Sequence, residues 1–315
     1  MDKTSLIFVA GHLGLVGSAI VRRLRAQGYS NLACRSRAEL ELTDHAAVMQ
    51  FFREVQPEFV FLGAAKVGGI LANSTYPADF LRDNLAVQGN VIEAARLTGV
   101  RKLLFLGSSC IYPKFSPQPI PESALLTGPL EPTNEWYAIA KIAGLKMIQA
   151  YRRQYGFQGI SLMPTNLYGP GDNFDLTSSH VIPALLRKFH DAKERGEPSV
   201  VVWGTGTPRR EFLHVDDLAA AAIHLMQTYD CDEWINVGSG SDLSIRELAG
   251  LIREVVGYPG GIIFDSSKPD GTPRKLLDIA RLRETGWQPS IGLAEGLRQT
   301  YRWFLDHRQT ARLSH

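Results

Sequence analysis

A tyrosine and a lysine four residues apart are the side chains of this sequence best suited to acid–base chemistry. Tyr137 and Lys141 lie in a predicted helix, which brings positions i and i+4 onto one face. Because a neighbouring ammonium favours the phenolate, the pair is expected to lower the pKa of Tyr137. Such a tyrosine can give a proton to a carbonyl oxygen while the carbon is reduced, or take the proton back.

A glycine-rich turn near the N-terminus predicts a phosphate-binding site. Its three glycines follow an apolar run of strand length at residues 5–10 and open a helical pattern. Such a turn lets backbone amides approach a pyrophosphate, and the helix N-terminus favours the anion. An ordinary tight turn would also use glycine, but the position at the first strand and first helix favours a dinucleotide. The residues expected to contact it are Gly11, His12, Leu13, Gly14, Leu15, Val16 and Gly17.

A serine and a cysteine follow the predicted strand at residues 103–107. Open α/β sheets bind ligands at the carboxyl ends of their strands, so the Ser108 hydroxyl could hold a substrate carbonyl beside Tyr137. Cys110 stands two residues further on. A free cysteine is more often a small buried hydrophobic side chain than a reactive group, and both interpretations are open at this point.

Composition and charge exclude several classes of function. The 315 residues are enough for two lobes, and the net charge of +2 favours neither nucleic acid nor an anionic membrane as a partner. The three cysteines, Cys34, Cys110 and Cys231, lack paired spacing, which indicates a reducing, cytoplasmic environment. We find no Cys/His cluster typical of a metal site, no signal peptide and no apolar stretch long enough to span a membrane.

Strand and helix patterns alternate through the first half of the chain. This alternation predicts an α/β fold, a Rossmann-type doubly wound parallel sheet with a smaller C-terminal α/β substrate lobe. Strands are expected near 5–10, 31–34, 59–63, 102–107, 159–163, 200–202, 234–237 and 261–264. Helices are expected near 14–27, 43–54, 77–98, 134–156, 180–194, 215–228, 244–256 and 290–307. We assign 1–165 to dinucleotide binding and 166–315 mainly to substrate binding, with about 200–235 as a candidate return to the first domain.

With these motifs placed, the chain resembles the extended short-chain dehydrogenase/reductases, and among them the GDP-L-fucose synthase family. The segments that carry the resemblance are residues 64–69, 107–113, 164–170, 179–183 and 268–274. The resemblance implies a bifunctional, NADPH-dependent enzyme that epimerises C3 and C5 of GDP-4-keto-6-deoxy-D-mannose and then reduces C4 to give GDP-L-fucose. It also implies a homodimer, joined through the helices near 77–98 and 134–156.

The resemblance assigns the reduction to three side chains. Ser108 and Tyr137 would stabilise negative charge on the C4 oxygen, which serves enolate formation and reduction alike. Lys141 would tune Tyr137 and hold the nicotinamide ribose.

Two further side chains, Cys110 and His180, are implied to exchange the protons at C3 and C5. A thiol titrates near neutrality beside a cation, and imidazole does so unaided. His180 could equally be a helix-start residue behind Ser178 and Ser179 as caps. Which of the two groups removes each proton stays open.

The cofactor implied by the resemblance is NADPH. The second strand ends without an acidic residue, and an arginine at its tip suits the 2′-phosphate of NADP. Arg37 holds the family position, whereas Leu13 stands where related enzymes typically carry arginine, which predicts a weaker preference for NADPH than usual. The remaining contacts implied are Asp44, Ala64, Ala65, Lys66, Lys141, Pro164, Asn166, Leu167 and His180.

The nucleotide sugar needs cations for its diphosphate and a wall for its base. By resemblance, Lys188 and Arg210 would bind the phosphates and Trp203 would form an aromatic wall. Asn166 and Asp270 would add polar contacts. From the residues alone, Lys188 could belong to a basic helix face and Trp203 to the core.

Two rival interpretations use the same motifs. Another nucleotide-sugar epimerase or a dehydratase of the family would keep the Tyr–Lys pair, but dehydratases typically carry Asp-Glu where Ser109 and Cys110 stand. A non-catalytic NADP-binding sensor would often lose Tyr137 or Lys141, and both are present.

Overall fold

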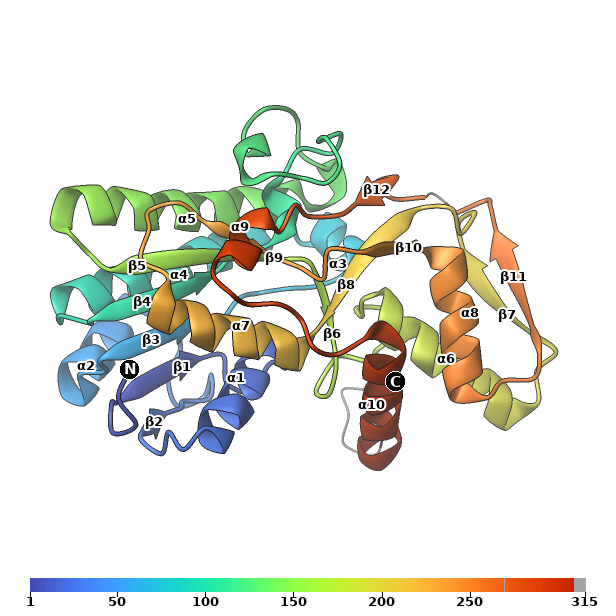
Figure 1. Ribbon diagram of the computed structural model, residues 1–315, viewed down its shortest axis with the longest axis horizontal. Coiled ribbons are helices and arrows are strands. Elements are labelled where there is room, and N and C mark those ends of the chain that lie inside the picture. Colours follow the sequence, from blue (N-terminus) through green and yellow to red (C-terminus); the bar gives the residue numbers. More distant parts are fainter. Residues whose placement is uncertain (269, 309–315) are drawn as a thin grey trace.

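The computed structural model describes residues 1–268 and 270–308, in which a large lobe built around a parallel sheet carries a smaller lobe on one side (Figure 1). The sheet has the strand order β2-β1-β3-β4-β5-β9, and every pairing in it is parallel. Its strands are β1 (Ile7–Ala10), β2 (Leu32–Ala33), β3 (Phe59–Leu62), β4 (Lys102–Leu106), β5 (Gly159–Pro164) and β9 (Ile235–Val237). Helices cover both faces of this sheet, so its strands are buried on both sides. Their sequences are therefore continuous apolar runs rather than alternating ones.

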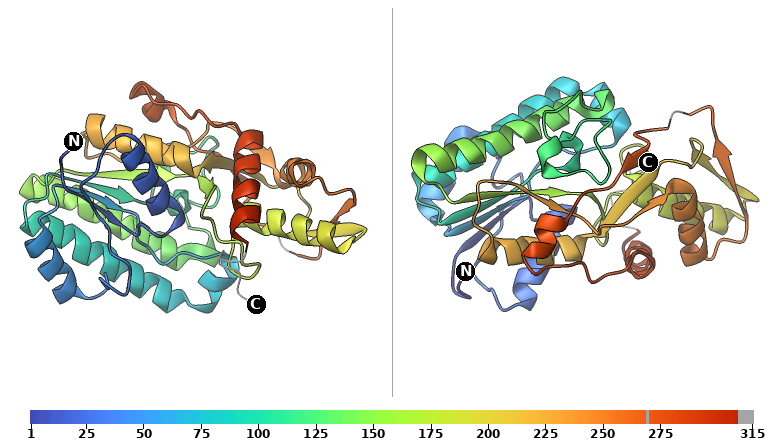
Figure 2. Two further views of the ribbon diagram at one scale, coloured as in Figure 1. Left: turned by 90° about the horizontal axis from the view of Figure 1, so that it is seen from below. Right: turned by 45° about the horizontal axis from the view of Figure 1, so that its top comes forward.

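The helices of the large lobe form two layers. Helices α1 (Leu15–Ala26) and α7 (Val215–Thr228) pack together on one face of the sheet. Helices α2 (His45–Val55), α4 (Pro77–Leu97) and α5 (Glu135–Tyr155) pack together on the other (Figure 2). The chain crosses from one side of β1 to the other between β2 and β3, which makes the carboxyl end of β1 a topological switch point.

The smaller lobe has its own apolar core, which includes Phe174, Leu186, Phe189 and Ile252. Its elements are α6 (Val181–Arg195), β7 (Ser199–Trp203), α8 (Ile245–Val256), β11 (Gly261–Asp265) and α10 (Leu293–His307). A second sheet lies between the two lobes and contains β6 (Asn166–Tyr168), β8 (Arg209–His214), β10 (Asp242–Ser244) and β12 (Arg274–Lys275) (Figure 1). Two short helices complete the fold, α3 (Ile70–Thr75) and α9 (Ala280–Glu284).

The predicted α/β class with a parallel sheet is confirmed, and the predicted helices and strands agree with the observed ones to within a few residues. The elements that the sequence did not predict are α3, α9, β6, β8, β10 and β12. None of them carries a long apolar run, and all but β8 are short, so tertiary pairing rather than local pattern decides them. Helix α7 and strand β9 lie in the large lobe, although they follow the segment 166–203. The boundary near residue 165 remains a proposal.

One buried amide ties two distant segments to the end of the sheet. Asn236 on β9 is fully buried, and its Nδ2 donates to the carbonyl oxygens of Ile120 (3.0 Å) and Asp278 (3.1 Å). Its Oδ1 accepts from the hydroxyl of Tyr112. The long loop after β4 and the segment after β12 therefore share one polar anchor.

We expect Asn236→Ala to lower the free energy of unfolding by about 1–3 kcal/mol, because buried carbonyl groups would lose their donor. Asn31→Ala is the matched control, because its side-chain amide is exposed and donates to the Thr4 carbonyl, and we expect a change within about 0.5 kcal/mol. Equilibrium denaturation in urea measures both. Equal effects of the two substitutions would contradict the role assigned to Asn236.

Candidate active site

The glycine turn between β1 and α1 is built with almost no spare room. Gly11 has a φ of +85°, and a Cβ there would lie 2.8 Å from backbone atoms of Ala64. A Cβ on Gly17 would lie 2.1 Å from the carbonyl oxygen of Gly11, so helix and turn abut directly. Gly14 is the N-cap of α1, whose first turn has neither a side-chain cap nor an acidic residue. A pyrophosphate fits this arrangement, because helix amides stay available for an anion.

The adenosine end of the expected cofactor site lies near the tip of β2. Arg37 is exposed, and its Nε donates to Glu41 at 2.6 Å, so a 2′-phosphate would compete with this carboxylate. Asp44 caps α2 by accepting from the amide of Ala47 at 3.0 Å. The ammonium of Lys66 is paired with carboxylates of α4, including Asp83 at 2.9 Å. The side chains assigned to this end are thus engaged with other protein groups, and their roles toward the cofactor remain proposals.

The pair Tyr137 and Lys141 lies on the first turns of α5, beneath the end of β4. The Lys141 Nζ donates to the carbonyl oxygen of Leu106 at 2.8 Å and lies 5.8 Å from the centre of the Tyr137 ring. Burial lowers the pKa of Lys141 to about 7. Burial also raises the pKa of Tyr137, the negative charge of Cys110 adds to this, and a hydrogen bond with Ser108 opposes it only in part.

The predicted lowering of the Tyr137 pKa is therefore wrong in this structure. The ammonium of Lys141 is turned toward Leu106 and is itself short of solvent, so it cannot outweigh the desolvation of the phenol. A phenol with a raised pKa is protonated at neutral pH, which is the form that can donate a proton to a carbonyl oxygen.

Several predicted cofactor contacts gather at the carboxyl edge of the sheet. Ala64 and Ala65 follow β3, and Pro164 is the last residue of β5. Asn166 and Leu167 lie in β6, where the Asn166 side chain donates to the Glu211 carbonyl at 2.8 Å.

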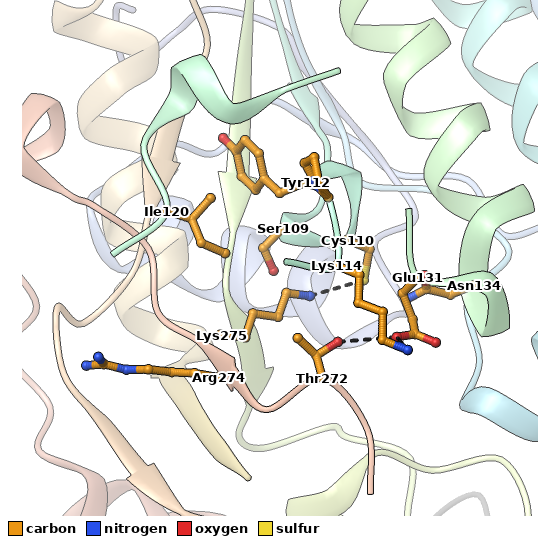
Figure 3. A pocket seen from close by; sticks show the side chains of 11 residues that line it. Ser109, Cys110, Tyr112, Lys114, Ile120, Glu131, Asn134, Thr272, Arg274 and Lys275 are labelled. Carbon is orange, nitrogen blue, oxygen red and sulfur yellow. Dashed lines mark hydrogen bonds and ion pairs between the residues drawn. The ribbon is translucent and has the colours of Figure 1, made fainter. Parts of the chain in front are cut away.

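Cys110 lies in the turn after β4, and a lysine that the sequence did not single out is directed at it. The Lys275 Nζ lies 3.4 Å from the Cys110 Sγ. A dashed line marks this contact in Figure 3. Burial alone would raise the pKa of the thiol, but the Lys275 charge, hydrogen bonds with Ser108 and Lys275, and the Arg210 charge together lower it. Cys110 is thus poised toward the thiolate.

His180 is the residue immediately before α6, and its side chain forms no capping hydrogen bond. The imidazole is accessible to solvent on one side, while the protein that surrounds it elsewhere lowers its pKa. The Lys275 ammonium lowers it further. The charge of Lys275 therefore acts on both Cys110 and His180.

The predicted substrate contacts fall into two groups. Lys188 from α6 lies over the Trp203 ring at 5.4 Å, and Lys268 lies over the same ring at 5.6 Å. Trp203 is 66% exposed, which leaves a broad apolar surface for a base and excludes the alternative of a core tryptophan. Asp270 accepts from the amide and hydroxyl of Thr205, and so stabilises the neighbouring loop. Pro269, which belongs to the same motif, lies outside the described residues.

Arg210 comes from β8, beside the catalytic candidates, and the charge of Asp270 also acts on it. It is half-buried, and its Nη1 donates to the carbonyl oxygen of Arg209 at 2.8 Å. Neither Lys188 nor Arg210 has a carboxylate within 4 Å among residues 1–268 and 270–308. Burial lowers the pKa of both cations, which a bound diphosphate would offset.

Sequence reasoning missed Lys275 and the pair Lys114 and Glu131, all of which line the pocket beside Cys110 (Figure 3). Lys114 and Glu131 form an ion pair at 3.0 Å, and the Thr272 hydroxyl also donates to Glu131. The available signal was position, because Lys275 directly follows the motif at 268–274.

Two further findings bear on the class of protein. Among the described residues there is no group of three or more His, Cys, Asp or Glu side chains that could hold a metal ion. Nor is any helix in the described ranges both long and apolar enough to cross a membrane. The three cysteines are free thiols.

Comparison with known proteins places the chain in a family. Residues 7–238 match the model of the NAD-dependent epimerase/dehydratase family. The chain belongs to this family. GDP-L-fucose synthase 1 of Arabidopsis thaliana is 62% identical over 304 residues, which cover 96% of this chain and 94% of that protein. GDP-L-fucose synthase of Escherichia coli (strain K12) is 57% identical over 315 residues, which cover 97% of this chain and 98% of that protein.

A solved structure adds the same grouping at the level of the fold. The GDP-L-fucose synthetase from Naegleria fowleri bound to NADP superimposes with a TM-score of 0.93 at 30% identity, covering 99% of this chain and 96% of that chain. Within the epimerase/dehydratase family, the chain therefore groups with the GDP-L-fucose synthases. The resemblance inferred from its motifs is confirmed.

We expect Gly17→Ala to destabilise the protein and to weaken NADPH binding at least tenfold, because the new Cβ would collide with the backbone of Gly11. Gly250→Ala in α8 is the control, because its new Cβ would meet open space, and it should keep both properties. Thermal unfolding and quenching of NADPH fluorescence measure the two effects. Unchanged NADPH affinity in Gly17→Ala would contradict the assignment of the turn.

Proposed function

We propose that this chain is a bifunctional NADPH-dependent enzyme that converts GDP-4-keto-6-deoxy-D-mannose to GDP-L-fucose. It epimerises C3 and C5 of the sugar and then reduces the C4 ketone. The observation that carries the proposal is the similarity to GDP-L-fucose synthases over nearly the whole length of both chains. The placement of the proton-transfer candidates around one cation supports it.

One ketone makes both half-reactions possible. The C4 carbonyl acidifies the protons on both neighbouring carbons, because the negative charge left by deprotonation moves onto the C4 oxygen. Groups that stabilise charge at that oxygen therefore assist proton removal and reduction alike. Ser108 and Tyr137 are proposed for this task, since both lie at the end of β4 and the start of α5.

The two epimerisations need a base on one side of the ring and an acid on the other. Cys110 and His180 are proposed as this pair, and Lys275 links them electrostatically. Cys34 and Cys231 are not part of this arrangement, and we assign them no chemical role.

The cofactor proposed is NADPH, which supplies the hydride that reduces C4. The Gly11–Gly17 turn would hold the pyrophosphate through backbone amides, and the buried His12 Nδ1, which has no hydrogen-bond partner in the described part of the chain, marks an unsatisfied polar group in that turn. Lys141 would hold the nicotinamide ribose, and Arg37 would bind the 2′-phosphate in place of Glu41.

The nucleotide-sugar substrate is proposed to lie between the lobes. Lys188 and Arg210 would bind the diphosphate, Trp203 would stack on the base, and Asn166 and Asp270 would add polar contacts. Further buried polar atoms without a partner in residues 1–268 and 270–308 lie in segments next to the catalytic candidates, Asn134 Oδ1 and Ser179 Oγ. A bound sugar could satisfy them.

We also propose that the protein is a cytoplasmic homodimer without nucleic-acid or membrane partners. Free cysteines and a nearly neutral net charge support this assignment. The dimer is proposed to form through α4 and α5, which leave large apolar side chains exposed. These side chains are Leu85, Leu97, Trp136, Ile139 and Tyr155.

Proton NMR of the products tests the proposed function. Incubation with GDP-4-keto-6-deoxy-D-mannose and NADPH should give GDP-L-fucose, with one NADPH consumed per product at 340 nm. A 6-deoxy sugar with unchanged C3 and C5 would indicate a reductase alone. Absence of turnover in protein that binds NADPH would indicate a sensor and contradict the proposal.

Two variants should separate the two half-reactions. We expect Cys110→Ser to keep NADPH binding but to lower deuterium incorporation from solvent at C3 and C5 by about 10²-fold or more, because its hydroxyl is a far weaker acid–base group. Tyr137→Phe should lower the rate of NADPH oxidation by about 10²–10⁴-fold while much of the exchange persists. Mass spectrometry and absorbance at 340 nm measure these rates.

Cys231→Ser and Tyr76→Phe serve as controls, because the first thiol contacts Asp232 and Tyr229 rather than the catalytic candidates, and the second ring is exposed. Exchange at the rate of the unchanged protein in Cys110→Ser would remove that thiol from the mechanism.

A further inference from the structure

We propose that Lys275 is a positioning residue for epimerisation, whose ammonium holds Cys110 as the thiolate that removes a proton beside the C4 ketone. The inference rests on the proposed function. In this proposal, Cys110 is kept deprotonated by Lys275, which lies in a two-residue strand 165 positions later in the sequence.

The contact itself is direct and directional. The Lys275 Nζ lies 3.4 Å from the Sγ of Cys110, within the range of a hydrogen bond to sulfur. The side chain of Arg274, the preceding residue, extends away from Cys110, as expected for the alternating side chains of a strand (Figure 3). Arg274 is instead paired with Asp242 at 2.5 Å. The two neighbouring cations of the strand therefore have different partners, because Arg274 binds a carboxylate and Lys275 contacts the thiol.

The backbone around Lys275 is fixed from several sides. Strand β12 pairs with β8 in a parallel register that sets Lys275 opposite Arg210. The next two amides donate to buried or half-buried side chains, Leu276 to Gln118 at 2.9 Å and Leu277 to Glu211 at 3.0 Å. Glu211 is fully buried, and its other carboxylate oxygen accepts from the amide of Gly240 at 2.7 Å, so it holds two backbone segments together.

The loop after β4 completes this support. The amide of Ile120 donates to the Leu276 carbonyl at 2.7 Å, and the amide of Asp278 donates to the Ile120 carbonyl at 2.9 Å. Asn236 then binds the carbonyl groups of both Ile120 and Asp278. A lysine of ordinary surface function needs no such framework, whereas a cation that must meet one sulfur atom does.

The charges around Cys110 leave Lys275 as the dominant cation. The charge of Arg210 on β8 also acts on the sulfur, the Ser108 hydroxyl shares a hydrogen bond with it, and the Tyr137 phenol on α5 interacts with its charge. Lys114 and Glu131 line the same pocket, but their charges are paired with each other. In the part of the chain that the structure describes, no carboxylate lies within 4 Å of Lys275 to neutralise it.

The proton transfer balances with these groups. The C–H bond beside the ketone breaks, the proton forms the S–H bond of Cys110, and the electron pair moves into the enolate. A proton returned to the same carbon from the opposite face, by His180 in its charged form, restores the ketone. Exchange with water then takes the proton from the Cys110 thiol and returns one to the His180 imidazole, so that both groups are ready for the next carbon. No redox change occurs, and Lys275 stays an ammonium throughout. Its positive charge stabilises the Cys110 thiolate before the transfer, and it makes the charged His180 a stronger acid, which helps His180 to release its proton.

The first test measures the thiol without any sugar. The rate of alkylation of Cys110 by iodoacetamide is followed against pH by peptide mass spectrometry, in the NADPH-bound protein. Lys275→Gln should raise the apparent pKa of Cys110 by about one unit or more, which means about tenfold less thiolate at pH values below it. Lys275→Arg should restore most of the effect, and Lys114→Gln, which removes a paired cation of the same pocket, should leave the titration unchanged.

Lys275→Met provides a second charge-free variant of similar length, and NADPH binding identifies the variants that fold. If the apparent pKa of Cys110 in Lys275→Gln or Lys275→Met equals that in the unchanged protein, the proposal is overturned.

The second test uses the 4-keto sugar and solvent deuterium. In Lys275→Gln, the rising limb of exchange at C3 and C5 should move to higher pH by the same amount as the alkylation curve. A higher KM for the sugar nucleotide in Lys275→Gln, together with an unchanged apparent pKa of Cys110, would show that Lys275 binds phosphate instead and would contradict the proposal. If the protein does not act on this sugar, the exchange experiment fails while the alkylation result stands, so the two failures are distinguishable.

Discussion

Loss of water at the carboxyl edge of the sheet is the constraint that governs this site. Burial raises the pKa of Tyr137, lowers the pKa of Lys141 to about 7, and lowers the pKa of His180. Each shift favours the neutral form of its group, as expected where charge is poorly solvated. Cys110 is the exception, because a directed ammonium reverses the effect of burial on its pKa. The site thus combines a protonated phenol with a thiol that readily ionises.

The combination suits a reaction that moves protons before it moves a hydride. A neutral phenol can donate to the C4 oxygen, while a thiolate can remove a proton from a neighbouring carbon. Both tasks need the groups to hold their places, and the fold supplies this through buried polar anchors rather than loops alone. Asn236 and Glu211 bind backbone groups of segments that are far apart in the sequence and adjacent at the site.

Local pattern was sufficient to predict much of this molecule. Short stretches of sequence are enough to predict the apolar strands, the glycine turn and the long helices. The parallel sheet with its helical layers follows from the order of these elements. Motifs also located Ser108, Cys110, Tyr137 and His180. The protonation of Tyr137 was predicted wrongly, because spacing on a helix does not show where the Lys141 ammonium points.

The role of Lys275 could not be predicted, because it depends on the pairing between β12 and β8, which brings together segments that are far apart in the sequence. Two residues of strand carry no periodicity, and no local signal shows that a lysine will meet a cysteine so far away in sequence. Such contacts become visible only when the tertiary structure is known.

The central claim is that one pocket presents a phenol, a thiol and an imidazole to a single sugar ring. A crystal structure of the protein with NADP and GDP-L-fucose tests this most directly. We expect the C4 oxygen within hydrogen-bonding distance of Tyr137 and Ser108, with the Cys110 sulfur and the His180 ring on opposite faces of the pyranose. A sugar ring held elsewhere, with either the sulfur or the imidazole out of reach of C3 and C5, would contradict it.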